Sequence, residues 1–133
     1  MVIAFLMMNP FHHSINPIKN DRVRGGEYNG YVAFDGKLPL SWQGGADYDE
    51  EETLDNMVSV HGGITFDHSA IGDLMDNGII PITSIPDPKS IENFRVIGFD
   101  TLHCDDTPER WPIEAVKEET IQLMEQIEKL LEK

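Results

Sequence analysis

The sequence predicts an α+β fold in which a small mixed or antiparallel sheet carries a long C-terminal helix packed on it. Short apolar runs bounded by glycine, proline and asparagine recur before the C-terminal segment, as is typical of strands. From Ile113 to Leu131, apolar side chains then recur at helical spacing. The length of 133 residues suits one core, so we expect a single domain over residues 1–133.

Four segments are expected to form strands. Val2–Met8 is a continuous apolar run, which favours a strand buried on both faces. Tyr28–Phe34 mixes aromatic, β-branched and glycine residues, and Phe94–Asp100 is the clearest internal strand. Val58–Phe66 is expected to hold a short strand interrupted by a pair of glycines.

Helical and irregular segments alternate with these strands. Ser69–Asn77 predicts a two-turn helix, because its apolar residues fall on one face and a glycine follows. Ile79–Pro88 has prolines after β-branched residues, which favours an edge segment or a loop. The acidic stretch Asp47–Asn56 suits either the start of a short helix or a solvated loop. Pro112 suits the first turn of the helix at Ile113–Leu131.

Composition narrows the functional classes. The chain has 10 Lys and Arg against 24 Asp and Glu, a formal net charge of −14. This charge repels nucleic-acid phosphates and no basic cluster offsets it, so general nucleic-acid binding is not expected. Cys104 is the single cysteine, which excludes an intrachain disulfide. No apolar run approaches the ~20 residues that cross a bilayer. We therefore expect a cytoplasmic protein with no membrane partner.

The first motif with chemical potential runs from Val60 to Phe66. Gly62 and Gly63 allow positive φ and a close backbone approach, and their amides can form a small anion-binding nest. His61 before the pair and Thr65 after it supply polar groups that can be oriented. We expect His61, Gly62, Gly63 and Thr65 to contact a ligand. A glycine-rich β-bulge with a hydrogen-bonded histidine is the structural alternative.

The second motif follows the strand at Phe94–Asp100. The buried strand runs directly into Asp100, His103 and Asp106, and a rigid strand positions polar groups at its end well. Asp100 and His103 are close enough in sequence to touch, and both are expected to bind the ligand. Asp100, His103 and Asp106 also offer ligands for a divalent metal such as Zn, Mn or Mg. A loop-capping Asp100 with a solvent-facing His103 is the structural alternative.

We predict that the two motifs converge, although about forty residues separate His61 from His103. Each motif places a histidine and a small polar residue beside a glycine bend or a strand end. Convergence would give one shared site rather than two separate polar loops.

These motifs resemble those of a family of small phage and prophage proteins of unknown function. The resemblance is carried by the order of three segments, Asn29-Gly30-Tyr31-Val32-Ala33, His61-Gly62-Gly63-Ile64-Thr65-Phe66 and Gly98-Phe99-Asp100-x-x-His103-x-x-Asp106. It covers roughly residues 29–133, with the middle unmatched. Thr101 stands where the family usually has cysteine, and Asp105 where it has glycine. The resemblance implies a phage-encoded cytosolic protein and supplies no reaction.

Three functions remain open. The favoured one is a binding module that captures a small, nucleotide-derived host molecule, in a sequestration or counter-defence role. Aromatic side chains such as Tyr31 or Trp111 would stack on a base, and Arg22, Arg24 or Arg95 would offset an anionic group.

The second function is a metal-dependent hydrolase that uses His61, Asp100 and His103. The third is an inhibitor of a host protein, in which the acidic segment Asp47–Asp55 mimics nucleic acid or docks on a basic partner. A small molecule is the expected partner in the favoured function. A homo-oligomer is a further expectation, in which the apolar stripe of Ile113–Leu131 packs on a second copy instead of on the sheet.

Overall fold

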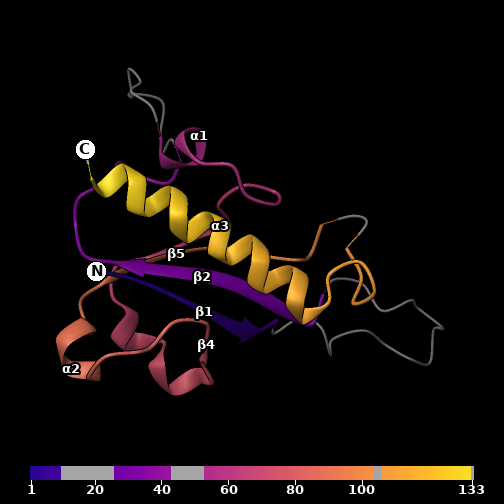
Figure 1. Ribbon diagram of the computed structural model, residues 1–133, viewed down its shortest axis with the longest axis horizontal. Coiled ribbons are helices and arrows are strands. Elements are labelled where there is room, and N and C mark those ends of the chain that lie inside the picture. Colours follow the sequence, from indigo (N-terminus) through magenta and orange to yellow (C-terminus); the bar gives the residue numbers. More distant parts are fainter. Residues whose placement is uncertain (10–25, 43–52, 104–105, 133) are drawn as a thin grey trace.

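The computed structural model describes residues 1–9, 26–42, 53–103 and 106–132. These form a five-stranded sheet in the order β3-β5-β2-β1-β4, with α3 (Ile113–Leu131) lying across one face (Figure 1). Every paired strand is antiparallel to its neighbour. The expected α+β fold is confirmed. The other elements are β1 (Val2–Met8), β2 (Tyr28–Phe34), α1 (Leu54–Met57), β3 (Phe66–His68), β4 (Ile80–Pro81), α2 (Pro88–Ile91) and β5 (Arg95–Phe99).

The central strands are buried on both faces, as the continuous apolar run Val2–Met8 predicts. Alternate side chains of a strand point to opposite faces, so β1 contributes to two separate apolar clusters. Leu6 packs into the cluster under α3, whereas Ile3 and Phe5 pack into the cluster on the opposite face. That second face is covered by the chain between β3 and β5, including α2, so the sheet lies between two layers (Figure 1).

Helix α3 reaches close to the sheet at Gly30, which is part of the first segment of the family resemblance. A Cβ at Gly30 would lie 2.1 Å from Thr120 Oγ1 and 2.5 Å from the Phe99 ring. Thr120 is fully buried and its hydroxyl donates to the Val116 carbonyl at 2.6 Å. Glycine at this position therefore has a structural role, because any side chain would force the helix off the sheet.

Two expected elements differ in the structure. Val58–Phe66 contains no strand before Phe66, and β3 begins only at that residue, because side chains of α3 bind the backbone at Ser59 and His61 instead of a strand. Ser69–Asn77 is not a two-turn helix but two single 3-10 turns, Ile71–Asp73 and Met75–Asn77. The prediction was wrong there because the amides of Asp73, Leu74 and Asn77 bond to carbonyls three residues back, which closes 3-10 turns instead of α-helical ones.

The remaining expected elements are confirmed with small changes. The β1, β2 and α3 bounds agree with the sequence pattern, and β5 is one residue shorter at each end than Phe94–Asp100. The edge segment at Ile79–Pro88 supplies β4 at the edge of the sheet. Pro112 precedes α3 as its N-cap rather than lying in its first turn.

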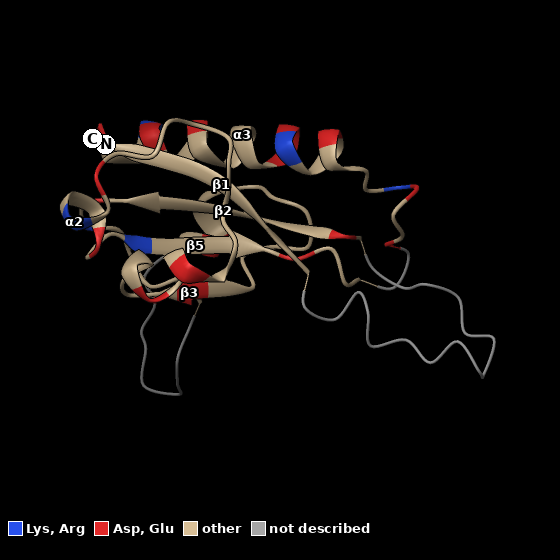
Figure 2. Cartoon of the chain, turned by 90° about the horizontal axis from the view of Figure 1, so that it is seen from below, with Lys and Arg blue, Asp and Glu red and all other residues tan. Residues whose placement is uncertain are grey.

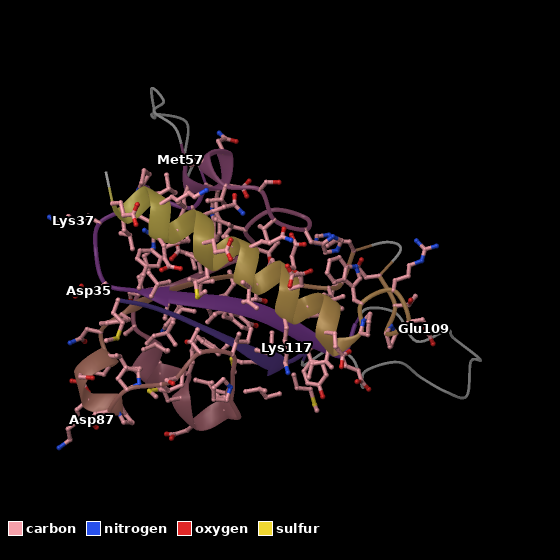
Figure 3. The ribbon with its side chains drawn as sticks, viewed as in Figure 1. Asp35, Lys37, Met57, Asp87, Glu109 and Lys117 are labelled. Carbon is pink, nitrogen blue, oxygen red and sulfur yellow. The ribbon has the colours of Figure 1, made fainter. Side chains whose placement is uncertain are left out.

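Acidic residues dominate the charged positions along the described chain (Figure 2). In Figure 3, Glu109 lies beside the start of α3, while Asp35 and Lys37 lie beyond its C-terminal end. Helix α3 thus runs from one end of the molecule to the other. The two histidine motifs lie at the end where α3 begins. None of the helices formed by the described residues has the length and apolar character to cross a membrane.

Candidate functional site

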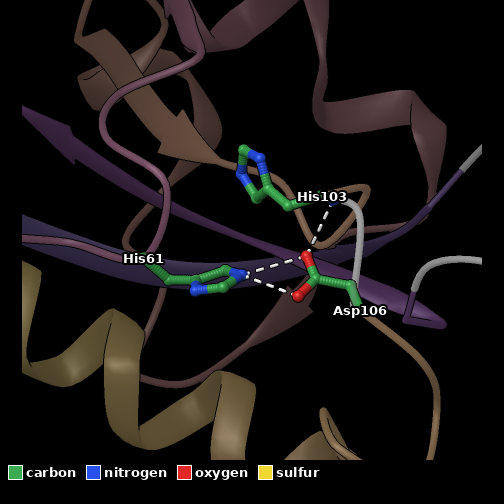
Figure 4. A group of neighbouring side chains, drawn as sticks. All are labelled: His61, His103 and Asp106. Carbon is green, nitrogen blue, oxygen red and sulfur yellow. Dashed lines mark hydrogen bonds and ion pairs between the residues drawn. The ribbon is translucent and has the colours of Figure 1, made fainter.

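The two histidine motifs converge, as predicted. The rings of His61 and His103 have centroids 5.0 Å apart and meet edge to face. Asp106 lies beside them and completes a three-residue group (Figure 4). The convergence is produced by a turn at His61–Gly62 and by the loop after β5, which bring the ends of the two motifs together.

Asp106 is the most buried member of this group, with a side chain only 4% exposed. Both of its carboxylate oxygens lie 2.9 Å from His61 Nε2, and Oδ2 accepts the backbone N–H of His103 at 2.9 Å (Figure 4). An ionised carboxylate can only accept hydrogen bonds, so Nε2 carries the proton in this arrangement. Asp106 thus links the histidine of one motif to the backbone of the other.

His103 has an unsatisfied ring nitrogen. Its Nε2 is shielded from solvent and makes no hydrogen bond to any described residue. The nearest carboxylate oxygen is Oδ1 of Asp100, at 3.4 Å, and that oxygen already accepts the Leu102 N–H at 3.0 Å. A buried nitrogen without a partner costs about 1–3 kcal/mol, which makes this ring the least satisfied group of the site.

The glycine pair positions this ring, and the amides around the bend are partly in use. Gly62 and Gly63 adopt φ values of +69° and +81°, and a Cβ on Gly62 would lie 1.9 Å from His103 Nε2. The amide of Ile64, after the bend, donates to Asp55 Oδ1 at 2.7 Å. The Gly63 amide donates to the Val60 carbonyl at 2.9 Å. These two amides are therefore used internally, and one already holds a carboxylate.

Side chains of α3 bind the backbone of the first motif and of the residues just before it. Glu119 accepts the His61 N–H at 3.2 Å, and Gln126 bonds to both the amide and the carbonyl of Ser59 at 2.7 and 2.8 Å. The indole of Trp111 packs on the His61 ring with centroids 4.2 Å apart. Sequence reasoning missed Glu119 and Gln126. Their spacing of seven residues, which places them on one helix face, was the available signal.

A separate cavity of about 220 Å³ opens beside Asp100. It will be called the motif pocket, because all three segments of the family resemblance contribute to its lining. Its lining residues are Asn29, Tyr31, Thr65, Phe66, Phe99, Asp100 and Leu102. Asp100 lines this pocket and also faces His103, so it connects the pocket with the histidine group.

Several polar groups around the motif pocket are already occupied. Asn29 Oδ1 accepts the Thr101 N–H at 3.1 Å, and the buried Thr101 hydroxyl donates to the Tyr28 carbonyl at 2.8 Å. Thr101 is thus structural, at the position where the resembling family has cysteine. Burial raises the pKa of the Tyr31 phenol, the Asn29 hydrogen bond opposes this, and the Asp100 charge adds to it. Tyr31 therefore stays neutral at physiological pH.

Arg95 does not serve as an anion contact. Its guanidinium donates to both carboxylate oxygens of Asp67 at 2.9 and 2.7 Å and to the carbonyls of Leu38 and Pro39. Burial raises the pKa of Asp67, but hydrogen bonds from Arg95 and Ser41 outweigh it and leave this pKa below its usual value. The network fixes the chain after β2 to the edge of the sheet. Arg95 is therefore committed to structure.

Several residues raised by the sequence lie outside the described residues. These are Cys104, Asp105, Arg22, Arg24 and residues 47–52 of the acidic stretch. Of the described part of that stretch, Asp55 is engaged with the Ile64 amide.

The described residues contain one group able to hold a metal ion, formed by His61, His103 and Asp106. One ring nitrogen of each histidine and one carboxylate oxygen lie within 4.8 Å of one another. The sequence pointed to Asp100, His103 and Asp106 as ligands and added His61 in the hydrolase hypothesis; the structure groups His61, His103 and Asp106. Asp100 lies outside the group, facing His103.

Comparisons with protein-family models, curated proteins and solved structures found no match to this chain. No family is therefore assigned, and the resemblance to phage proteins stays an expectation. The function must be inferred from the geometry of the site.

Proposed function

We propose that this protein binds a small molecule in the motif pocket. The observation that carries the proposal is that three segments far apart in the sequence meet around one cavity. Asn29 and Tyr31 come from β2, Phe66 begins β3 with Thr65 just before it, and Asp100 directly follows β5. Binding sites combine an apolar floor with a few oriented polar groups, and this lining has that composition.

The lining favours a flat ring that carries hydrogen-bond donors. Tyr31 and Phe66 provide an aromatic floor and already meet edge to face with centroids 5.3 Å apart, whereas the Phe99 ring packs under α3 on the other face of the sheet. Asp100 contributes a carboxylate that is 27% exposed and can accept further hydrogen bonds. An amino group on a heteroaromatic ring matches this acceptor. A hydrogen bond to a charged group is worth about 1.5–3 kcal/mol.

The pocket does not suit a phosphate. Its lining contains one acidic and no basic residue, and the chain as a whole carries a net charge of −14. A volume of about 220 Å³ is below the usual range for drug-sized ligands, about 300–1,000 Å³. A nucleobase or the base end of a nucleoside is of suitable size. We therefore propose a nucleotide-derived ligand whose base, rather than its phosphate, enters the motif pocket.

Capture without turnover is the role that we favour. If the chain is phage-encoded, as the family resemblance implies, capture of a host molecule would remove it from host use. Turnover is the second candidate, because His61 and His103 lie together beside Asp100 and could act as base and acid. No comparable observation supports inhibition of a host protein. In the described part of the acidic stretch, Asp55 has a structural role, because it accepts the Ile64 amide.

Two matched ligands test the proposal. Binding of adenosine and purine riboside, which lacks the amino group of the base and gains no other donor, is measured by calorimetry with a chelator present. Adenosine is expected to bind at least about tenfold more tightly, which corresponds to about 1.4 kcal/mol for its bond to Asp100. Asp100→Asn should abolish this preference. Asp87→Asn, an exposed acid next to α2, should keep it (Figure 3).

The same samples separate capture from turnover. After incubation the protein is denatured and the released molecule is identified by mass spectrometry. Intact ligand supports capture, whereas a processed product that disappears in His61→Gln supports the second candidate. Equal binding of adenosine and purine riboside, or a preference that survives in Asp100→Asn, would contradict the assignment of the motif pocket.

A further inference from the structure

We propose that His61, His103 and Asp106 form a binding site for a divalent transition-metal ion of the Zn²⁺ class. This site is distinct from the motif pocket and goes beyond the proposed function, because ion binding needs no organic ligand. The three side chains come from both histidine motifs and supply two imidazole nitrogens and one carboxylate (Figure 4).

The donor set selects the class of ion. Two imidazoles and one carboxylate are a combination found at catalytic zinc sites, where a fourth position stays open for water. Imidazole suits Zn, Cu, Fe and Ni, whereas Mg²⁺ and Ca²⁺ prefer sites made of oxygen atoms alone. We therefore expect Zn²⁺ or Co²⁺ to bind and Mg²⁺ not to compete.

The present distances are close to those that an ion requires. Metal–ligand bonds of about 2.0–2.1 Å at tetrahedral angles place two donor atoms about 3.3 Å apart. His61 Nε2 lies 2.9 Å from both oxygens of Asp106, so an ion can replace the shared proton with a small outward shift. The three donor atoms lie within 4.8 Å of one another, so the His103 nitrogen must move toward the other two donors to bind the same ion. The His103 side chain is 37% exposed.

His103 has the unpartnered atom that such a site would satisfy. A metal-bound histidine normally donates its other ring N–H to a carboxylate, which fixes the tautomer and raises the basicity of the ligand. The buried Nε2 of His103 has no hydrogen-bond partner among the described residues, and Asp100 Oδ1 lies 3.4 Å from it. With an ion on Nδ1, a small rotation would bring Nε2–H within hydrogen-bonding distance of Asp100. Asp100 is then a positioning residue rather than a ligand.

The surrounding structure holds the first histidine in place. Trp111 packs on the His61 ring, and Glu119 on α3 anchors its backbone amide. Gly62 leaves room for the His103 ring, where any side chain would collide with it. Asp100 faces His103 and also lines the motif pocket, so a bound ion would place positive charge close to that pocket. The pocket lining itself contains no basic residue. A phosphate outside the pocket could be held there.

The chain contains a matched control for this site. His68 Nε2 lies 2.9 Å from Asp73 Oδ2, the same separation as in the His61–Asp106 pair. Asp73 is 71% exposed, and no third donor joins this pair in the described residues. An exposed histidine–carboxylate pair of this kind should not hold an ion by itself.

The test is a Zn²⁺ titration of chelator-treated protein by calorimetry, with Co²⁺ absorption in the visible range as a report on the ligand geometry. No organic ligand is present, so the result is independent of the motif pocket. Wild type is expected to bind one ion per chain. His61→Gln, His103→Gln and Asp106→Asn should each weaken binding more than about 100-fold, since even outer-shell partners are worth about 10–100-fold. His68→Gln should stay within about twofold of wild type, because that pair lies outside the group.

Circular dichroism melts identify any variant that fails to fold. Should Asp106→Asn unfold, the decision rests on His61→Gln and His103→Gln, whose side chains are partly exposed. The proposal is overturned if wild type shows no saturable binding, if the folded variants bind as wild type does, or if His68→Gln loses affinity to the same extent.

Discussion

The sheet with α3 and the site at the start of α3 are held together by different forces. In the first region, Leu123 and Ile127 are fully buried and pack against β-strand side chains. In the second region, side chains bond to backbone groups, as in the contacts of Asp55 with Ile64 and of Glu119 with His61. Apolar packing tolerates many residues of similar size. Side-chain hydrogen bonds to the backbone require particular residues, so the site should be more sensitive to conservative changes.

The two His–Asp pairs show the same contrast at the level of single contacts. Their N–O separations are equal, yet Asp106 is 4% exposed and accepts a backbone amide, whereas Asp73 is 71% exposed. Exposed pairs contribute about 0–1 kcal/mol, because water screens them. Distance alone therefore does not define a site; burial and a third partner do.

The largest expected effect on stability comes from a substitution in the apolar region between α3 and the sheet. Leu123→Ala should lower the free energy of unfolding by about 2–5 kcal/mol, because the side chain is fully buried and the substitution leaves a cavity. Leu102→Ala, on the rim of the motif pocket, should change it by less than about 0.5 kcal/mol, because Leu102 is exposed. Urea denaturation measures both. A loss below about 0.5 kcal/mol for Leu123→Ala would show that α3 does not pack as described.

An intermediate effect separates backbone strain from contact with the site. Gly62 and Gly78 both have positive φ, but a Cβ would strike His103 at Gly62 and meet nothing within 4 Å at Gly78. Gly78→Ala should cost about 1–2 kcal/mol from strain alone. Gly62→Ala should cost at least as much and should also displace the His103 ring, which weakens Zn²⁺ binding. Thermal melts of both variants measure the loss of stability, and Zn²⁺ titration measures the loss of ion affinity. Equal ion affinity in the two variants would mean that Gly62 does not position His103.

The smallest expected effect tests how α3 holds the first motif. Gln126→Ala removes both hydrogen bonds to Ser59, and because both are exposed to water each contributes about 0.5 kcal/mol, so the total cost should be about 1 kcal/mol. Gln122→Ala removes only a contact of 3.5 Å with Glu118 and should be close to neutral. Hydrogen exchange at the Ser59 amide should accelerate in the first variant alone. Unchanged exchange there would show that the segment is held by other contacts.

Much of the fold is predictable from local patterns. The bounds of β1, β2 and α3 follow from runs and periods of apolar residues, because burial in a sheet or against a helix imposes a repeat on the sequence. The errors fall where the repeat is absent. Val58–Phe66 has strand-forming residues, but α3 side chains occupy its backbone groups, and no local pattern records that pairing.

The composition of the site is only partly predictable. His61, His103 and Asp106 stand out as polar residues next to a glycine bend or after a buried strand. Their grouping depends on a turn, a loop and the face of a helix that are distant in sequence. The bond of the Gly63 amide to the Val60 carbonyl and the commitment of Arg95 to Asp67 are likewise tertiary facts, and each engages a group that the sequence offered to a ligand.

The amino-acid sequence by itself determined the α+β class, the long helix and the residues able to carry chemistry, because hydrophobic periodicity and side-chain type are local properties. Only the tertiary structure decided which of those residues meet. Of the four side chains that the sequence offered to a metal, it grouped His61, His103 and Asp106 and left Asp100 at the border between that group and the motif pocket. The physical reason is that donor atoms must converge in space within a few ångströms, and that convergence is set by packing between distant segments.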